Sequence, residues 1–359
     1  MSSVWSNNKL SISVFGESHG KGIGVVIDGI PAGVEIDENY ILQMMDRRRP
    51  GKNRMSTPRS ESDTPIIYSG VYSGRTTGAP ICCVINNSDT HSSDYSEMQS
   101  LARPGHADYT GFLRYSGFND VRGGGHFSGR LTAPIVFAGA VCGLYLKQLK
   151  ITSGAHLAQV KDVCDDLFDP ANISKELLDS LKLKTVPTIN DEKAPLIEDV
   201  IEAARHDLDS VGGIIECAAV NVPAGVGDPM FGGIENIISS LVFGVPAVKG
   251  IEFGAGFDVC EMFGSENNDD FYADESGNIK TVTNNHGGIL GGITSGMPIV
   301  FRAALKPTPS IAKPQKTINF KSNKNTEIAV KGRHDPCVAV RAVPVIESCM
   351  NIALASFLI

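Results

Sequence analysis

Alternating apolar and polar positions predict strands near the start of the chain. Residues 10–15 alternate in this way, and residues 22–28 follow with a similar pattern after a short turn at 16–20. That turn contains His19 next to Gly20, so we expect it to present the imidazole rather than bury it. Two further strands are expected at residues 66–72 and 80–85.

Apolar residues three and four positions apart predict the helices. Asp37 can cap a helix whose apolar face includes Ile41, Met44 and Met45 and which ends at the arginines 47–49. Together with the basic loop that follows, these arginines resemble a mobile flap that binds phosphate, although solvated arginines are also common at a helix end. Further helices are expected at residues 132–150, 174–181, 196–208, 235–243 and 337–358, and further strands at 214–222 and 248–253.

The order of these elements favours an α+β fold. Strands alternate with helices but lack the spacing of regular βαβ units, which indicates sheets and helices packed in layers as a β-α-β sandwich. No linker or low-complexity tract interrupts the sequence, so we expect one large domain over residues 1–359. The second half loosely repeats the element order of the first, which is compatible with an internal pseudo-repeat.

Composition narrows the class of protein. An apolar content of 42% and a charged content of 20% are typical of a soluble globular protein. The net charge of −8 argues against nucleic acid or an acidic membrane surface as a partner. The N-terminus shows no signal segment, and no uncharged apolar run reaches the roughly 18 residues that span a bilayer, so we expect a cytoplasmic protein. The eight cysteines form no CxxC pair and no cluster with histidine, which predicts buried thiols and no metal site.

The stretch 103–130 differs from the rest of the chain. It has few aliphatic side chains but contains two histidines, seven glycines and several arginines and aromatic residues. Cationic and titratable groups on a glycine-bent backbone suit an anionic ligand held close to the main chain. A solvated basic loop is the alternative, but such a loop needs neither the Gly123–Gly125 run nor regularly spaced aromatic residues.

Other histidines share this setting. Five of the eight lie in glycine-rich turns far apart in the sequence, namely His19, His106, His126, His286 and His334. Arginine binds carboxylates and phosphate, and histidine moves protons near neutral pH. The GK[ST] phosphate loop, GxGxxG, GxSxG and HExxH signatures are all absent. Spacing alone therefore predicts an enzyme acting on a phosphorylated or carboxylated metabolite.

Eight sequence blocks, in their order along the chain, resemble the chorismate synthase family. They are FGESHG at 15–20, DRRRPG at 46–51, RPGHADYT at 103–110, RGGGHFSGR at 122–130, PAVKGIEFGAGFD at 246–258, NHGGILGGITSG at 285–296, LKPTPSI at 305–311 and KGRHDPCVAVRAVP at 331–344. The agreement of all eight supports the resemblance, since no single block would suffice.

The resemblance implies a carbon–oxygen lyase of the shikimate pathway, which supplies aromatic amino acid biosynthesis. The reaction is the anti 1,4-elimination of phosphate from 5-enolpyruvylshikimate 3-phosphate to give chorismate, with reduced FMN as a transient electron donor. NADPH is a candidate external reductant, because no reductase-like segment is visible in the chain. Family members usually form homotetramers, so a homotetramer is expected here.

The same resemblance implies roles for individual residues. His19 would protonate the departing phosphate, His106 would control protonation of the reduced flavin, and Asp335 would act as a base towards flavin N5. Substrate contacts are implied for Arg48, Arg130 and Arg341. Cofactor contacts are implied for His126, Phe127, Ser128, Pro246, Ala247, Gly291, Lys306, Pro307, Thr308, Pro309, Ser310 and Arg333, and for Arg48 and Arg54 in connection with NADPH.

One position departs from the family pattern. Many members have arginine where this chain has His126, and a neutral imidazole would weaken a fixed positive charge near the cofactor. Two alternatives to the lyase therefore stay open at this point: a flavin- or phosphometabolite-binding protein that has lost catalysis, and a phosphometabolite enzyme that needs no flavin. Retention of His19, His106 and Asp335 argues against the loss of catalysis.

Overall fold

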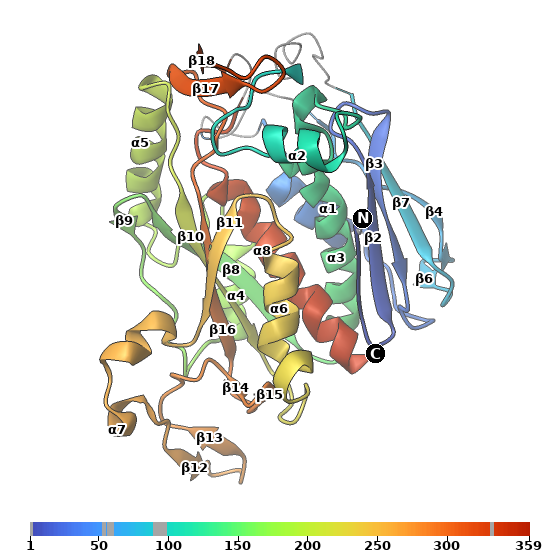
Figure 1. Ribbon diagram of the computed structural model, residues 1–359. Coiled ribbons are helices and arrows are strands. Elements are labelled where there is room, and N and C mark those ends of the chain that lie inside the picture. Colours follow the sequence, from blue (N-terminus) through green and yellow to red (C-terminus); the bar gives the residue numbers. More distant parts are fainter. Residues whose placement is uncertain (1–2, 52–54, 56–60, 89–98, 331–333) are drawn as a thin grey trace.

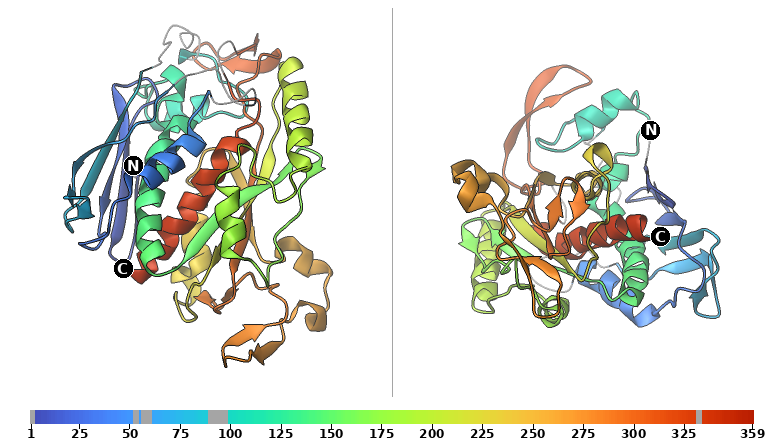
Figure 2. Two further views of the ribbon diagram at one scale, coloured as in Figure 1. Left: turned by 180° about the vertical axis from the view of Figure 1, so that it is seen from behind. Right: turned by 90° about the horizontal axis from the view of Figure 1, so that it is seen from below.

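The protein is described from a computed structural model, which covers residues 3–51, 55, 61–88, 99–330 and 334–359. The sequence predictions for Arg54 and Arg333 lie outside these described residues. Figure 1 shows two sheets that enclose a layer of helices, and Figure 2 shows the same three layers from behind and from below. The predicted α+β layered architecture is confirmed.

The first sheet is antiparallel and contains the strands predicted near the N-terminus. Its order is β1 (Val4–Asn7), β2 (Leu10–Gly16), β3 (Gly22–Asp28), β7 (Ile81–Asn86) and β4 (Ile66–Ser69). The single strand predicted over 66–72 is in fact divided at Gly70, whose φ is +82°. A Cβ there would lie 2.6 Å from Ile81 Cγ1, so the close approach to β7 requires glycine. The chain then turns into the short hairpin of β5 (Val71–Tyr72) and β6 (Arg75–Thr76).

The second sheet is also antiparallel and lies on the other side of the helices. Its order is β11 (Val248–Phe253), β16 (Ile299–Leu305), β10 (Gly213–Val220), β8 (Thr152–Val160) and β9 (Val163–Cys164). The strands β8 and β16 were not predicted from the sequence. Both are buried along most of their length, so they lack the alternation that identifies a strand with one exposed face.

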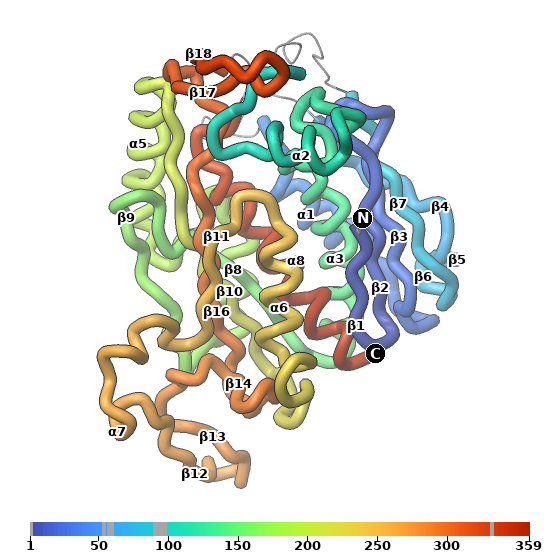
Figure 3. Tube along the Cα trace, viewed as in Figure 1, coloured from blue at the N-terminus to red at the C-terminus, as the bar shows by residue number. Residues whose placement is uncertain are grey.

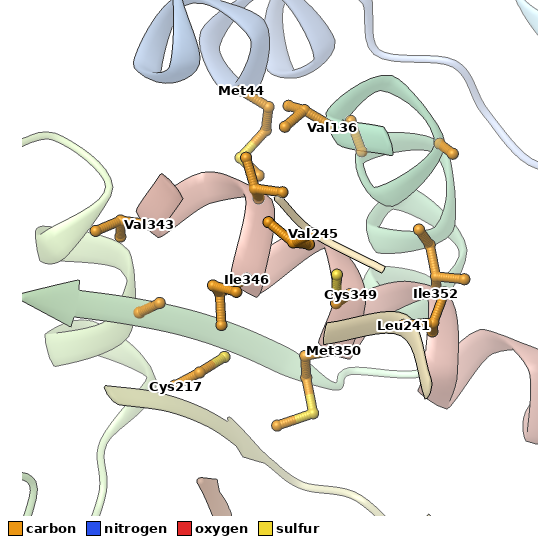
Figure 4. Packing of buried hydrophobic residues seen from close by; sticks show 14 of the residues in the cluster. Met44, Val136, Cys217, Leu241, Val245, Val343, Ile346, Cys349, Met350 and Ile352 are labelled. Carbon is orange, nitrogen blue, oxygen red and sulfur yellow. The ribbon is translucent and has the colours of Figure 1, made fainter. Parts of the chain in front are cut away.

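Three long helices fill the space between the sheets: α1 (Glu38–Arg48), α3 (Thr132–Gln148) and α8 (Ala339–Leu358). Asp37 caps α1 by accepting a hydrogen bond from the Tyr40 amide at 3.1 Å, as the sequence predicts. Helices α3 and α8 approach closely because a Cβ at Gly139 would lie only 2.2 Å from Ser348 Cβ. Figure 4 shows Met44, Val136, Ile346 and other side chains of the three helices packed together in this core.

The remaining elements surround these layers, and the tube in Figure 3 follows the chain through them. They are α2 (Asp108–Arg114), α4 (Lys175–Leu181), α5 (Lys193–His206), α6 (Ile234–Val242), α7 (Gly264–Asn267), and the hairpins of β12 (Phe271–Ala273) with β13 (Ile279–Thr281), β14 (Ile289–Leu290) with β15 (Ile293–Thr294), and β17 (Gln315–Asn319) with β18 (Lys324–Ile328). Two short turns lead into α3: Arg122–Phe127, which is kinked at its three glycines, and the 3₁₀ turn Gly129–Leu131.

Two helical stretches are long and apolar enough to cross a bilayer by length and composition alone. They are Gly129–Gln148 and Ala339–Leu358, and 78% and 89% of their respective apolar windows are buried inside the protein. Such burial is what core helices of soluble proteins show, because their apolar side chains contact protein rather than lipid. All eight cysteines are free, and five of them are buried as predicted, whereas Cys164 and Cys260 are exposed and Cys82 is half-buried.

A buried charged cluster connects β8 with β10. His156 is fully buried, and its Nδ1 lies 3.1 Å from Asp165 Oδ2 while its Nε2 lies 2.8 Å from Glu216 Oε2. Burial alone would lower the pKa of His156, but the two carboxylates raise it above the ordinary value. The two carboxylates therefore favour the protonated imidazole, and this contribution to stability is fully present below the unfolded pKa of about 6.5.

We expect this stabilisation to fade as the pH rises through the raised pKa of His156. The difference in free energy of unfolding between the wild type and His156→Gln should therefore become smaller as the pH rises from 6 to 9. Urea denaturation at several pH values measures this difference. His206→Gln replaces an exposed histidine and serves as the control for the substitution itself. A pH-independent difference for His156→Gln would contradict the expectation.

Candidate active site

A cleft of about 650 Å³ opens at one end of the helical layer. Segments far apart in the sequence line it: the end of α1, the stretch 103–130, the connection from α6 to β11, the segment after β16, and the start of α8. Its volume lies within the range of pockets that bind cofactors and small substrates. The stretch 103–130, predicted to hold an anionic ligand, contributes the largest share of the lining side chains.

The glycine run inside that stretch separates two histidines. Gly123, Gly124 and Gly125 all have positive φ, so the turn depends on residues without a side chain. A Cβ at Gly123 would lie 2.4 Å from His19 Cδ2 and 2.6 Å from His19 Nε2. A Cβ at Gly124 would lie 3.2 Å from His106 Nε2. The turn therefore brings both imidazoles against one short stretch of backbone that lines the cleft.

His106 is oriented by two charged neighbours in its own loop. Its Nδ1 lies 2.8 Å from Asp108 Oδ1, and Arg103 binds the same carboxylate at 2.6 Å. Burial lowers the pKa of His106, and the positive charges of Arg103 and Lys306 lower it further against the opposing influence of Asp108. The imidazole is therefore neutral at pH 7. With Nδ1 donating to Asp108, Nε2 keeps a lone pair that lies 3.4 Å from Arg103 Nη2 and can accept a proton.

A second charged cluster lies at the cleft. Its central residue, Asp63, was not predicted from the sequence. The Asp63 carboxylate binds both Arg48 and Arg130, and Glu61 lies 3.9 Å from Arg130. Arg48 also donates to Thr132 Oγ1 at 3.0 Å.

Burial distinguishes this cluster from a solvated basic flap. Arg48 is 2% exposed and Asp63 1% exposed, so neither is solvated as an arginine at a helix end commonly is. Burial lowers the pKa of Arg48 to about 9, and the group stays protonated at neutral pH. Burial raises the pKa of Asp63, but the two guanidinium groups lower it more, so the carboxylate is ionised.

Arg341 and Asp335 form a third pair at the start of α8. Arg341 Nη1 donates to Asp335 Oδ2 at 2.6 Å, and its Nε donates to the Arg48 carbonyl at 3.0 Å. Both side chains line the cleft and are mostly buried. The pair ties α8 to the end of α1, so the arginines predicted to bind substrate lie close to one another.

His126, the residue that departs from the family pattern, also lines the cleft. Its Nδ1 donates to the Gly16 carbonyl at 2.8 Å, and its Nε2 lies 2.6 Å from the Ser3 hydroxyl, which can donate to it. Both ring nitrogens are therefore satisfied in the neutral form. The imidazole ties the N-terminal strands to the glycine turn and adds no fixed charge to the cleft.

Most of the residues predicted to contact a cofactor line the cleft, and they come from three segments. Phe127 and Ser128 come from the glycine-rich stretch, Pro246 and Ala247 from the connection before β11, and Lys306, Thr308, Pro309 and Ser310 from the segment after β16. The Lys306 amide donates to the Ala247 carbonyl at 2.9 Å, which joins two of these segments. Among the described residues, the buried Thr308 Oγ1 has no hydrogen-bond partner. A polar ligand in the cleft would satisfy this hydroxyl, so the lining fits a flavin.

Some predicted site residues lie outside the cleft lining. His19 lies next to Gly123, which does line the cleft, and Pro307 is exposed beside it. Gly291 is in the hairpin of β14 and β15, where its neighbour Gly292 accepts from the first amide of α6 at 2.9 Å. Helix α6 has nine residues and is therefore about 13 Å long. Ala247 follows the other end of this helix, so Gly291 does not line the cleft of this chain.

The structure also places two histidines that were singled out without a role. His334 lines the cleft, whereas His286 lies away from it, with its Nε2 3.6 Å from Asp269 Oδ2. Within the described part of the chain, no group of three or more histidine, cysteine or acidic residues could hold a metal ion.

Comparisons with known proteins identify the family of this chain. The chorismate synthase family profile matches residues 10–359. The chorismate synthase of Lachnoclostridium phytofermentans is 47% identical over 348 residues, covering 97% of this chain and 93% of that protein. The chorismate synthase of Pyrococcus abyssi is 47% identical over 353 residues, covering 98% and 96%. A crystal structure of a chorismate synthase superposes with a TM-score of 0.78 at 28% identity, covering 98% of this chain and 92% of the other. This chain therefore belongs to the chorismate synthase family, the lyases that eliminate phosphate from 5-enolpyruvylshikimate 3-phosphate to form chorismate in the shikimate pathway.

Proposed function

We propose that this chain carries out its elimination with reduced FMN and substrate bound together in the 650 Å³ cleft. The family uses a flavin cofactor. One observation supports the cleft as its site: cofactor-assigned residues from three separate segments line this one cleft together with His106 and the paired arginines. When bound, the reduced flavin supplies a transient electron to the substrate, and the protein supplies orientation and charge.

Each side chain then has a defined task. His19, behind the glycine turn, would protonate the phosphate as it departs. His106, neutral and with Nε2 unprotonated, would hold or release the proton at the reduced flavin. Asp335 would act as the base at flavin N5, and its ion pair with Arg341 keeps the carboxylate within the cleft.

The arginines Arg48, Arg130 and Arg341 would bind the carboxylates and phosphate of the substrate. Asp63 already occupies one face of Arg48 and of Arg130, so substrate oxygens would bind the donors that point into the cleft. This arrangement limits the positive charge of the site and fixes both guanidinium planes before substrate binds. Preorganised donors of this kind cost little reorganisation when charge moves to the leaving phosphate.

We further propose that residues 1–359 act as one domain in a cytoplasmic homotetramer, and that flavin is reduced from outside, with NADPH as a candidate donor. Exposed apolar side chains such as Phe231, Phe257 and Phe263 favour association with further copies. Steady turnover on NADPH and oxidised FMN, with this chain alone and air excluded, would show that the chain reduces the flavin itself and would overturn the proposal that reduction takes place outside it.

Titration of FMN fluorescence tests whether the two ligands share the cleft. We expect FMN to bind more tightly, by about 10-fold or more, when 5-enolpyruvylshikimate 3-phosphate is present, because each ligand excludes water from the other and fixes shared side chains. By linkage, the substrate should gain the same factor from FMN. Equal FMN affinity with and without substrate would contradict a shared cleft, and absence of FMN binding would favour an enzyme that needs no flavin.

A further inference from the structure

Six cationic side chains line the cleft, and they differ in how their charge is balanced. The four guanidinium groups, those of Arg48, Arg103, Arg130 and Arg341, each form an ion pair with an aspartate. The two lysines do not. Within the described residues, no carboxylate lies within ion-pair distance of Lys249 or of Lys306, and Lys306 Nζ donates to the Gly105 carbonyl.

Local backbone geometry places Lys249 at this edge of the cleft. In the pairing of β11 with β16, Val248 lies opposite Leu305 and Gly250 lies opposite Ala304, so Lys249 is the extra residue of a β-bulge. Bulges redirect a side chain out of the regular alternation and are common beside active sites. Two residues earlier, Ala247 has a φ of +78°, a strained conformation for a residue with a side chain.

The bulge brings the two lysines to the same edge. The Ala247 carbonyl accepts from the Lys306 amide at 2.9 Å, so Lys306 begins directly opposite the segment that carries Lys249. Both lysines line the cleft at this edge. Burial lowers the pKa of Lys306, and the positive charge of Lys249 lowers it further. Lys249 is exposed and solvated, and an anion that contacts both ammonium groups would remove the repulsion between them.

We propose that Lys249 and Lys306 form the anchor for the phosphate monoester of the cofactor. Two ammonium groups match the two negative charges of such a phosphate at neutral pH. The arginines that line the cleft are already paired with aspartates, which leaves this lysine edge as its source of uncompensated positive charge within the described residues. The assignment of Lys249 goes beyond the cofactor residues implied by the family resemblance, and it rests on the proposed flavin site.

Comparing FMN with riboflavin tests the anchor, because riboflavin has the same ring system but no phosphate. Fluorescence titration should show that wild-type protein prefers FMN. In Lys249→Met the dissociation constant of FMN should rise about 10-fold or more, as expected for loss of a charged hydrogen bond, while that of riboflavin changes less than twofold. Lys249→Arg should recover most of the preference. Lys147→Met, which removes an exposed lysine at the end of α3, serves as the control and should change neither constant.

Other outcomes distinguish the claim that the lysines bind the cofactor phosphate from the claim that flavin binds in the cleft. If the wild type binds FMN in preference to riboflavin and Lys249→Met retains that preference, the lysine anchor is wrong and the flavin site stands. If Lys249→Met leaves FMN unchanged but weakens 5-enolpyruvylshikimate 3-phosphate, the lysines bind the phosphate of the substrate, which also overturns the assignment to the cofactor. If the wild type binds neither flavin, the proposed function itself fails.

Discussion

Replacing Gly123 with alanine is expected to lower kcat by about 100-fold or more. The new Cβ would lie 2.4 Å from His19 Cδ2 and 2.8 Å from Ser18 Oγ, so the imidazole must move away from the cleft. A displacement of about 1 Å in a catalytic group can reduce a rate by two orders of magnitude. The measurement is the anaerobic rate of phosphate release at saturating substrate and reduced FMN. Because His19 acts on the leaving phosphate in this account, the dissociation constant of FMN should change little.

Gly74→Ala is the matched control for this variant. Gly74 has a φ of +73°, close to the +60° of Gly123, but an added Cβ would meet no atom within 4 Å. It therefore introduces similar left-handed strain, of roughly 1 kcal/mol, without displacing a histidine. We expect Gly74→Ala to lose a little stability and to keep its kcat. If both variants lose activity equally, or if Gly123→Ala keeps full activity, the glycine turn does not position His19 as described.

Replacing Asp63 with asparagine is expected to reduce the free energy of unfolding by about 3–5 kcal/mol, because it leaves Arg48 and Arg130 as buried charges without their shared counter-ion. Urea denaturation at pH 7 measures the loss. The pH dependence gives an independent check. The depressed pKa of Asp63 stabilises the wild type above the unfolded value of about 3.9, and this contribution disappears as the pH falls through the folded pKa. The difference in free energy of unfolding between the wild type and Asp63→Asn should therefore become smaller at acidic pH.

Glu35→Gln is the control for the loss of a carboxylate. Glu35 pairs with Arg75 at 3.4 Å, and both side chains are more than half exposed, so the variant should change stability by less than about 1 kcal/mol. A small effect of Asp63→Asn would contradict the view that the two arginines depend on Asp63. A large effect that persists without narrowing at low pH would point to lost packing rather than lost charge.

Much of the fold could be predicted because local signals agree with tertiary structure. The strands β2 and β3 alternate, Asp37 caps α1, and the small residues of α3 match its close contact with α8. The inner strands β8 and β16 could not be recognised in the same way, because side chains buried on both faces remove the alternation. Alternation of apolar and polar residues indicates a strand with one exposed face, and these strands lack an exposed face.

The residues of the candidate site also include some that the sequence could predict and some that it could not. His19, His106 and the paired arginines follow from motifs, and the motifs indicate chemistry without geometry. Asp63 and Asp108 were missed, since their importance comes from which arginine or histidine each one contacts. Acidic residues beside basic motifs could have signalled both. Lys249 depends on a bulge that only strand register reveals.

The central claim is that this cleft eliminates phosphate with reduced FMN, and one anaerobic measurement tests it most directly. Purified protein and 5-enolpyruvylshikimate 3-phosphate are mixed with chemically reduced FMN, oxidised FMN or no flavin, and phosphate release is followed in the wild type and in His106→Ala. We predict release only with reduced FMN and a large loss in the variant. Tight binding of both ligands without release would favour a protein that has lost catalysis. Release that is equally fast without flavin would contradict the account.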